Sequence, residues 1–308
     1  MGLVNGKVIF EDALKNKYGV GAFNFVNLEV LKAILDTAEE LKSPVIVQCS
    51  TSAIKYAGVD ALVALARTYA SKMSVPVCLN LDHGKTFEDC KMCIDAGFTN
   101  VMIDASHLPM DENIALTRKV VEYAHARNVT VEAEIGVLAG VEDEVSASED
   151  DARYTNPKEA YDFVKATGVD SLAIAIGTSH GTVKFKGEAK LRFDILEEVE
   201  KLLPNFPIVL HGASSIPQDM VRLAEQYGAK LKGSNGIPET MLREACTHNV
   251  CKVNVDSDLR LCFTAGVRKS LFENPENVDM RKYNGEGMKL IRECVKGKIL
   301  NVFRSNRV

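Results

Sequence analysis

Residues 77–83, VCLNLDH, form a short apolar run that ends in Asp82 and His83, with Gly84 directly after it. A strand that only packs in a core does not need two titratable side chains at its end. Seven more apolar runs rich in β-branched residues are spread over the 308 residues. They are VGAFNF (20–25), VIVQCS (45–50), NVMIDAS (100–106), TVEAEIG (130–136), SLAIAIG (171–177), PIVLHG (207–212) and KVNVDS (252–257).

Amphipathic stretches separate these runs, for example NLEVLKAILDTAEELK at 27–42 and PMDENIALTRKVVEYAHARN at 109–128. Near-continuous apolar strands that alternate with helices are typical of a parallel sheet covered on its outer face. Eight such units in this length predict an α/β protein with a (β/α)8 TIM barrel rather than a doubly wound sheet. No glycine-rich dinucleotide fingerprint follows the first run. No linker divides the chain, so residues 1–308 should form a single domain, closed by a pair of extra C-terminal helices after residue 258.

Composition excludes several classes of partner. Apolar residues make up 46% and charged residues 26% of the chain, and the net charge of −5 leaves no basic footprint for nucleic acid. No apolar run approaches the ~18 residues of a membrane span, and the N-terminus lacks the apolar core of a signal peptide. The eight cysteines lie mostly in apolar runs, as reduced thiols do. We therefore expect a cytoplasmic protein, with Cys90 and Cys93 packed in a helix rather than acting as a redox or zinc pair.

Three of the six histidines fall at predicted strand ends, namely His83, His180 and His211. Catalytic groups of this fold come from the carboxyl ends of the strands. A single histidine there could simply cap its own strand, but three imidazoles at one mouth are typical of a catalytic zinc site. Asp82 beside such a ligand is placed for proton transfer. Because neighbouring residues of a strand point to opposite faces, the chain should turn at Gly84 for both side chains to serve.

The runs after the seventh and eighth strands, HGASS (211–215) and NVDSD (254–258), predict a phosphate site. Their glycine, hydroxyls and backbone amides suit an oxyanion, although such turns also occur without a ligand. Two long connections, 136–157 and 228–239, are predicted as lids or solvated insertions, and the second one joins two helices.

The motifs NLDHG, VEAEIG, IGTSHG, VLHGASS and KVNVDSDLR occur in the order and at the spacing of the class II, zinc-dependent fructose-1,6-bisphosphate aldolases. The chain resembles this family from about residue 5 to residue 303. The resemblance implies that His83, His180 and His211 hold the catalytic Zn²⁺ and that Asp82 is the proton donor to the aldehyde oxygen. Asp104 and Glu134 match positions that hold a second divalent ion in some members.

The resemblance also implies a set of substrate-binding residues around the metal. These are Asn24, Ser50, Gly181, Lys184, Gly212, Ala213, Ser214, Asn254, Asp256, Ser257, Arg260 and Arg281. Ser50 and Arg260 match contacts to the aldehyde-side phosphate, and Lys184 matches a position near the other phosphate, where a monovalent cation (Na⁺ or K⁺) often sits.

Two further residues match the family, Arg281 and Glu142. Arg281 follows Met280, where the family usually has proline, and by analogy it reaches the site of a neighbouring subunit. Glu142 matches a residue that takes the carbon-bound proton, and its alternative reading is one more charge in a solvated acidic run.

The predicted reaction is the reversible cleavage of fructose 1,6-bisphosphate to dihydroxyacetone phosphate and glyceraldehyde 3-phosphate by a homo-dimer or homo-tetramer. The expected partners are small sugar phosphates, without nucleic acid or membrane. The nearest alternative is a tagatose-1,6-bisphosphate aldolase, which differs only in the configuration at C4. A zinc hydrolase on the same barrel, a Schiff-base aldolase that uses Lys184 and a non-catalytic binding barrel are further alternatives.

Overall fold

The computed structural model describes residues 2–138, 140–142, 145–147, 153–179, 190–231 and 233–306. Within these residues, eight parallel strands close into a barrel in the order β1-β10-β9-β8-β5-β4-β3-β2. The predicted TIM barrel is therefore confirmed. The strands are β1 (Val20–Asn24), β2 (Val45–Ser50), β3 (Val77–Gly84), β4 (Asn100–Ile103), β5 (Thr130–Ile135), β8 (Ser171–Ile174), β9 (Ile208–Leu210) and β10 (Val250–Val255).

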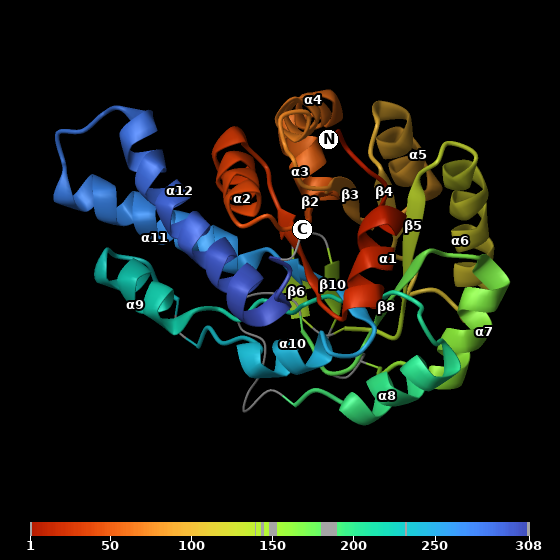
Figure 1. Ribbon diagram of the computed structural model, residues 1–308. Coiled ribbons are helices and arrows are strands. Elements are labelled where there is room, and N and C mark those ends of the chain that lie inside the picture. The colour runs from red at the N-terminus through yellow and green to blue at the C-terminus, as the bar shows by residue number, and fades with distance from the viewer. Residues whose placement is uncertain are drawn as a thin grey trace.

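Helices surround the barrel in a ring, as Figure 1 shows. They are α2 (Leu28–Glu40), α3 (Thr51–Ala57), α4 (Val59–Ala70), α5 (Phe87–Ala96), α6 (Met110–His125), α7 (Pro157–Thr167), α8 (Phe193–Leu202), α9 (Gln218–Gln226) and α10 (Glu239–Ala245). Local sequence sets several of their starts. Asn27 accepts a hydrogen bond from the backbone N–H of Val30, and Thr86 and Asp89 form a reciprocal capping box at the start of α5.

The helix α1 (Gly6–Asn16) closes the amino-terminal end of the barrel and lies in front of the strands in Figure 1. Its buried face, which includes Ile9, Phe10 and Ala13, packs with Val20 and Ile46 from the first halves of β1 and β2. The barrel is therefore sealed at this end. The functional groups must lie at the opposite end, where the strands finish.

Most strand bounds differ slightly from the predicted runs, and two of these differences matter here. β10 begins at Val250, two residues earlier than the predicted run, and β4 ends at Ile103, so that Asp104 lies just beyond the strand. The polar connection 136–157 also contains a two-stranded antiparallel hairpin, β6 (Gly140–Glu142) and β7 (Val145–Ala147), which the sequence pattern did not predict. Three-residue strands are too short to give an alternating pattern that can be recognised in sequence.

The predicted pair of C-terminal helices is confirmed as α11 (Ser257–Glu273) and α12 (Met280–Gly297), followed by a short π-helix, η1 (Lys298–Phe303). This hairpin projects from one side of the barrel, at the left of Figure 1. Arg292 of α12 forms ion pairs with Asp36 and Glu40, which ties the hairpin to α2. Among the described helices, none combines the length and the apolar character that a membrane span requires.

Candidate active site

The end of β3 places Asp82 and His83 at the mouth of the barrel by an irregularity of the backbone. His83 has a φ of 51°, and the pairing of β3 with β4 shifts between Leu81 and Gly84. The chain therefore turns at His83, and the expectation of a turn at Gly84 is wrong. Gly84 is needed for another reason, because a Cβ at this position would lie 2.8 Å from the carbonyl oxygen of Met102.

Two imidazoles meet at this mouth. His83 Nε2 lies 2.8 Å from His211 Nδ1. The opposite ring nitrogens face carboxylates, with His83 Nδ1 2.8 Å from Asp104 and His211 Nε2 2.7 Å from Glu132. A carboxylate accepts, so each of these outer nitrogens carries a proton. The two inner nitrogens then oppose each other with lone pairs unless a proton or another cation lies between them.

The two imidazole rings differ in pKa. Burial lowers the pKa of His83, but the hydrogen bond to Asp104 and the negative charges nearby outweigh it and raise the pKa to about 10. Burial and the positive charge of His83 lower the pKa of His211 to about 4. His83 is therefore the ring that holds a proton on its inner nitrogen, and a bound metal would take the place of that proton.

A third titratable group at the mouth is Glu134, whose Oε2 lies 3.7 Å from His211 Nδ1. Glu134 Oε2 is buried and has no hydrogen-bond partner among the described residues. Burial and the negative charge of Asp104 raise the pKa of Glu134 well above its ordinary range. An excess of carboxylates beside two imidazoles suits a divalent cation, because such a cation compensates their charge.

The described residues offer two possible ligand groups for a metal, and these share His83. One joins Asp82, His83 and His211, and the other joins His83, Asp104 and Glu134, with the ligand atoms of each group within 4.8 Å of one another. This donor set of nitrogen and oxygen atoms fits zinc. The predicted third histidine, His180, lies outside the described residues, as do Gly181 and Lys184.

Asp82 is held on both carboxylate oxygens by amides. Asn24 Nδ2 donates to Oδ2 at 2.8 Å, and Asn254 Nδ2 donates to Oδ1 at 2.9 Å. All three side chains are buried. Asp82 is therefore fixed next to the imidazole pair, in the orientation that these two amides impose.

A buried ion pair that the sequence pattern did not predict lies below the histidines. Lys252 Nζ lies 2.8 and 3.0 Å from the two carboxylate oxygens of Glu132, and both side chains are completely buried. Burial raises the pKa of Glu132, but Lys252 and His211 outweigh it and lower the pKa to about 2. The signal in the sequence was a charged residue in the middle of an apolar run, TVEAEIG for Glu132 and CKVNV for Lys252.

The predicted phosphate loop after β9 is held from below. Gly212 has a φ of 58°, and a Cβ there would lie 2.6 Å from the backbone of Ser179. Asp258 accepts hydrogen bonds from the backbone N–H groups of Ser215 and Ile216 at 3.1 and 2.7 Å. The loop is also joined to β10, because the backbone N–H of Asp256 donates to Ser214 Oγ at 3.4 Å. Ala213, Ser214 and Ser257 are buried in this region.

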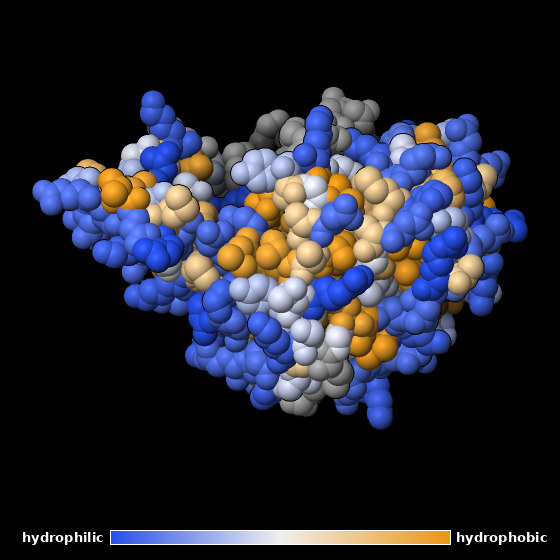
Figure 2. Space-filling view, turned by 90° about the horizontal axis from the view of Figure 1, so that it is seen from above, coloured by the Kyte–Doolittle hydropathy of each residue, from blue (hydrophilic) through white to orange (hydrophobic). Residues whose placement is uncertain are grey.

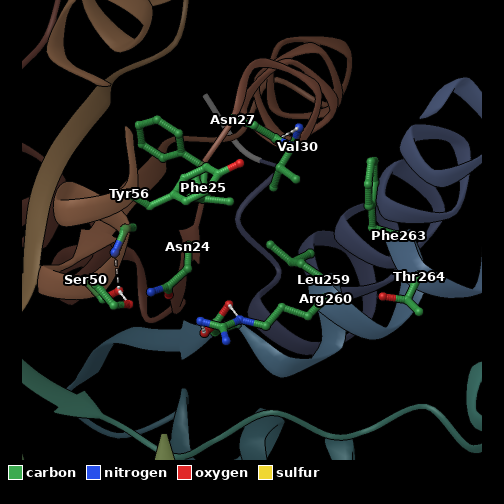
Figure 3. Close-up of a pocket in the computed structure, with 14 residues that line it drawn as sticks. Asn24, Phe25, Asn27, Val30, Ser50, Tyr56, Leu259, Arg260, Phe263 and Thr264 are labelled. Atoms are coloured by element: carbon green, nitrogen blue, oxygen red, sulfur yellow. Dashed lines mark hydrogen bonds and ion pairs between the residues drawn. The ribbon is translucent and has the colours of Figure 1, made fainter. Parts of the chain in front are cut away.

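A pocket of about 460 Å³ opens beside Asn24 and is lined by residues of α2, α3 and α11. Figure 3 shows Ser50, Asn24 and Arg260 on the same side of it. Arg260 Nη2 lies 2.7 Å from the carboxylate of Asp256, so this carboxylate faces an arginine and only the backbone N–H of Asp256 could serve an anion. The structure thus brings the predicted aldehyde-side residues Ser50 and Arg260 to one pocket.

Arg281 is not part of this pocket. It is the second residue of α12, at the turn of the projecting hairpin, where its side chain is 87% exposed and pairs with Asp279. Exposed apolar residues share this end of the hairpin, namely Leu271, Phe272, Val278 and Met280. Figure 2 shows a small hydrophobic group among hydrophilic side chains at the left end of the molecule, where the hairpin projects. Glu142 ends β6, and its side chain lies outside the described residues.

Comparisons with known proteins point to the family that the sequence motifs resemble. A family model described as fructose-bisphosphate aldolase class-II matches residues 4–307. A protein of Treponema pallidum (strain Nichols) named fructose-bisphosphate aldolase is 53% identical over 304 residues, which cover 92% of this chain and 91% of that protein. A protein of Helicobacter pylori (strain ATCC 700392 / 26695) with the same name is 48% identical over 307 residues, which cover 99% of this chain and 100% of that protein.

A solved structure gives the same result for the fold. The crystal structure of the YdjI aldolase from Escherichia coli K12 superposes with a TM-score of 0.80 at 29% identity, covering 99% of this chain and 98% of that one. Together with the match of the family model over nearly the whole chain, these similarities show that the chain belongs to the class II fructose-bisphosphate aldolase family.

Proposed function

We propose that the chain, as a single barrel domain over residues 1–308, catalyses the reversible aldol cleavage of fructose 1,6-bisphosphate to dihydroxyacetone phosphate and glyceraldehyde 3-phosphate. The observation that carries the proposal is the opposed pair of imidazole nitrogens, His83 Nε2 and His211 Nδ1, with Asp82 beside them at the barrel mouth. In the family named above this mouth holds zinc, and the donor set fits that ion.

In the proposed site His83, His180 and His211 hold the zinc. When bound, zinc supplies a Lewis acid for the C2 carbonyl of the ketose and for the charge that develops there during cleavage. Asp82 takes the proton of the C4 hydroxyl in the cleavage direction and returns one in the condensation direction. Asn24 and Asn254 keep Asp82 in the orientation that this transfer needs.

The two phosphates are assigned to opposite ends of the site. Residues after β9 and β10 bind the phosphate of the dihydroxyacetone half, and Ser50 and Arg260 bind the other one. The assignment is supported by the Gly212 turn with its backbone N–H groups and by the pocket that Ser50 and Arg260 share. Arginine binds phosphate through two parallel hydrogen bonds, which gives orientation as well as affinity.

Several finer points stay part of the proposal. Asp104 and Glu134 could take a second divalent ion, a role supported by the ligand group that they form with His83. Lys184 with a monovalent cation, and Glu142 as the group that moves the carbon-bound proton, rest on the family resemblance.

The exposed apolar end of the α11–α12 hairpin supports a homo-dimer or homo-tetramer in which Arg281 serves a neighbouring site. A cytoplasmic location fits the eight free cysteines, all of which lie within the described residues.

A coupled assay with fructose and tagatose 1,6-bisphosphates, each with and without chelator, tests the function. We expect cleavage of the fructose substrate, loss of activity on chelation and recovery with added zinc. A preference for the tagatose epimer would move the assignment to the tagatose enzyme. Activity that survives chelation but is lost with borohydride plus substrate would replace the metal mechanism with a Schiff base.

A further inference from the structure

A row of amide side chains crosses the barrel interior from the closed end to Asp82. Asn24, Gln48, Asn80 and Asn100 are contributed by β1, β2, β3 and β4, one from each strand. They are direct partners in the sheet register, with Asn24 beside Gln48, Gln48 beside Asn80 and Asn80 beside Asn100. All four are buried in a barrel interior that branched apolar residues usually fill.

Each amide in this row donates to the next one. Asn100 Nδ2 donates to Asn80 Oδ1 at 2.7 Å, and Asn80 Nδ2 donates to Gln48 Oε1 at 3.0 Å. Gln48 Nε2 donates to Asn24 Oδ1 at 2.8 Å, and Asn24 donates to Asp82 as described above. Barrel strands are tilted, so a row of register partners climbs along the barrel axis. The row therefore connects the lower part of the barrel with the mouth.

The lower end of the row begins at a helix. Thr130, the first residue of β5 and the register partner of Asn100, donates from Oγ1 to Asn100 Oδ1 at 2.5 Å. Its hydroxyl in turn accepts from the backbone N–H of Gly6 at 2.8 Å. Gly6 is the first residue of α1, where helix N–H groups carry partial positive charge. A Cβ at Gly6 would lie 2.8 Å from Thr130 Oγ1, so a glycine is required for this contact.

The two ends impose the same direction on the whole row. A backbone N–H can only donate, so the proton of Thr130 goes to an acceptor, and Asn100 Oδ1 at 2.5 Å is much nearer than the backbone oxygen of Thr99 at 3.4 Å. The carboxylate of Asp82 can only accept, so the Nδ2 group of Asn24 must face it, and every amide between them must follow. Hydrogen bonds that are aligned in this way polarise one another. The last donor, Asn24, is therefore oriented by groups that belong neither to the candidate metal ligands nor to the lining of the pocket.

We propose that Gln48, Asn80, Asn100 and Thr130 are positioning residues that act through Asn24 on Asp82, holding this carboxylate in its orientation for proton transfer. The proposal rests on the proposed function of Asp82, but the row itself does not. Breaking the row should lower kcat while KM for the bisphosphate stays nearly constant, because the phosphates and the metal bind the substrate elsewhere. The effect should diminish with distance from Asp82.

The decisive comparison uses Thr130, which lies furthest from the mouth. Thr130→Val removes the hydroxyl with little change in shape, and Thr130→Ser keeps it. Thr37→Val is the matched control, because Thr37 is also a buried threonine whose hydroxyl bonds within the protein, to Ala33 of its own helix. For Thr130→Val we expect a kcat about 2- to 5-fold lower, with KM within about twofold, since each bond strengthens its neighbour only modestly. Thr130→Ser and Thr37→Val should match the wild type.

A second variant keeps the test usable if Thr130→Val does not fold. Gln48→Glu keeps an acceptor for Asn80 but cannot donate to Asn24, so the amide of Asn24 has to choose between two carboxylates. We expect kcat to fall about 10- to 100-fold, as for the loss of a hydrogen bond to a charged group, with the zinc content unchanged. In an Asp82→Ala background neither substitution should lower the residual rate further.

A further experiment separates a failure of the proposed function from a failure of the positioning role of the row. The full-length protein is labelled with ¹⁵N, and the Asn24 side-chain amide signal, assigned by its loss in Asn24→Ser, is followed in the Thr130 variants. We expect it to move in Thr130→Val and not in Thr130→Ser, whichever sugar is the substrate. A wild type that does not cleave fructose 1,6-bisphosphate would overturn the proposed function. Equal kcat values and equal Asn24 signals for Thr130→Val and Thr130→Ser would overturn the proposal that the row positions Asp82.

Discussion

The two sides of the barrel interior support the active site with different chemistry. On the side of β1 to β4, neutral amides lead to Asp82, and each bond joins one donor to one acceptor. On the side of β5, β9 and β10, the buried ion pair of Lys252 and Glu132 lies beneath His211. The hydrogen bonds of the first network all run toward Asp82 and carry no net charge, whereas the ion pair of the second network sets the charge around His211.

This difference has an energetic consequence. A neutral amide that loses a partner leaves one unsatisfied polar group, which costs roughly 1–3 kcal/mol. A buried ion that loses its partner leaves an uncompensated charge and costs more. Substitutions on the amide side should therefore lower kcat while they change the free energy of unfolding only modestly. Substitutions on the charged side should mainly lower the free energy of unfolding.

The largest effect is expected at the end of the amide side. Asp82→Ala should lower the rate of cleavage by roughly 10²–10⁴-fold, the range for a positioned acid–base group, while the fold remains intact. The zinc content and the circular dichroism spectrum serve as controls. Near-normal turnover would show that Asp82 has only a structural role at the mouth of the barrel.

The most direct test of the charged side removes the cation of its ion pair, Lys252. Lys252→Met should lower the free energy of unfolding by about 3–5 kcal/mol, because Glu132 is left buried without its cation. Urea denaturation measures this loss of stability. Adding Glu132→Gln to this variant should restore part of the lost stability, and a double variant as unstable as Lys252→Met would contradict the pairing.

The stability that Glu132 contributes should depend on acid pH. Its folded pKa of about 2 lies below the ordinary value of 4.5, so the contribution is fully present above pH 4.5 and is lost as the pH falls through about 2. Unfolding of the metal-free wild type and of Glu132→Gln, compared from pH 6 to pH 3, should show a gap that narrows toward acid. A gap that stays constant would mean that Glu132 is not held as a carboxylate by Lys252 and His211.

The smallest effect sharpens the contrast with an exposed ion pair. Lys158 and Asp162 of α7 are 3.1 Å apart, but their side chains are 79% and 59% exposed. Lys158→Ala should leave the urea midpoint unchanged within error, because water and salt screen such a pair. A clear loss of stability here would weaken the argument that burial makes Lys252 important.

Much of the site could be predicted from the sequence because it follows from chain order. Asp82, His83 and His211 each end a recognisable apolar run, and parallel strands bring such ends to one mouth. The candidate ligands His83 and His211 therefore lie together at the mouth, and Ser50 and Arg260 line one pocket beside it, while their roles stay predictions. The turn at His83 was assigned to Gly84 instead, because a glycine is the usual residue at positive φ and nothing local marks a histidine there.

By itself the sequence determined the eight strands, the helices between them, the closing helix pair and the family, since periodicity and motif spacing are properties of the chain alone. Only the tertiary structure decided which polar residues of different strands become neighbours. Gln48, Asn80 and Asn100 each stand as a single amide in an apolar run, and Lys252 as a single cation. Register and strand tilt make partners of residues that lie 20 to 120 positions apart. These depend on how the whole barrel closes, because each strand's offset is set by its neighbours around the ring.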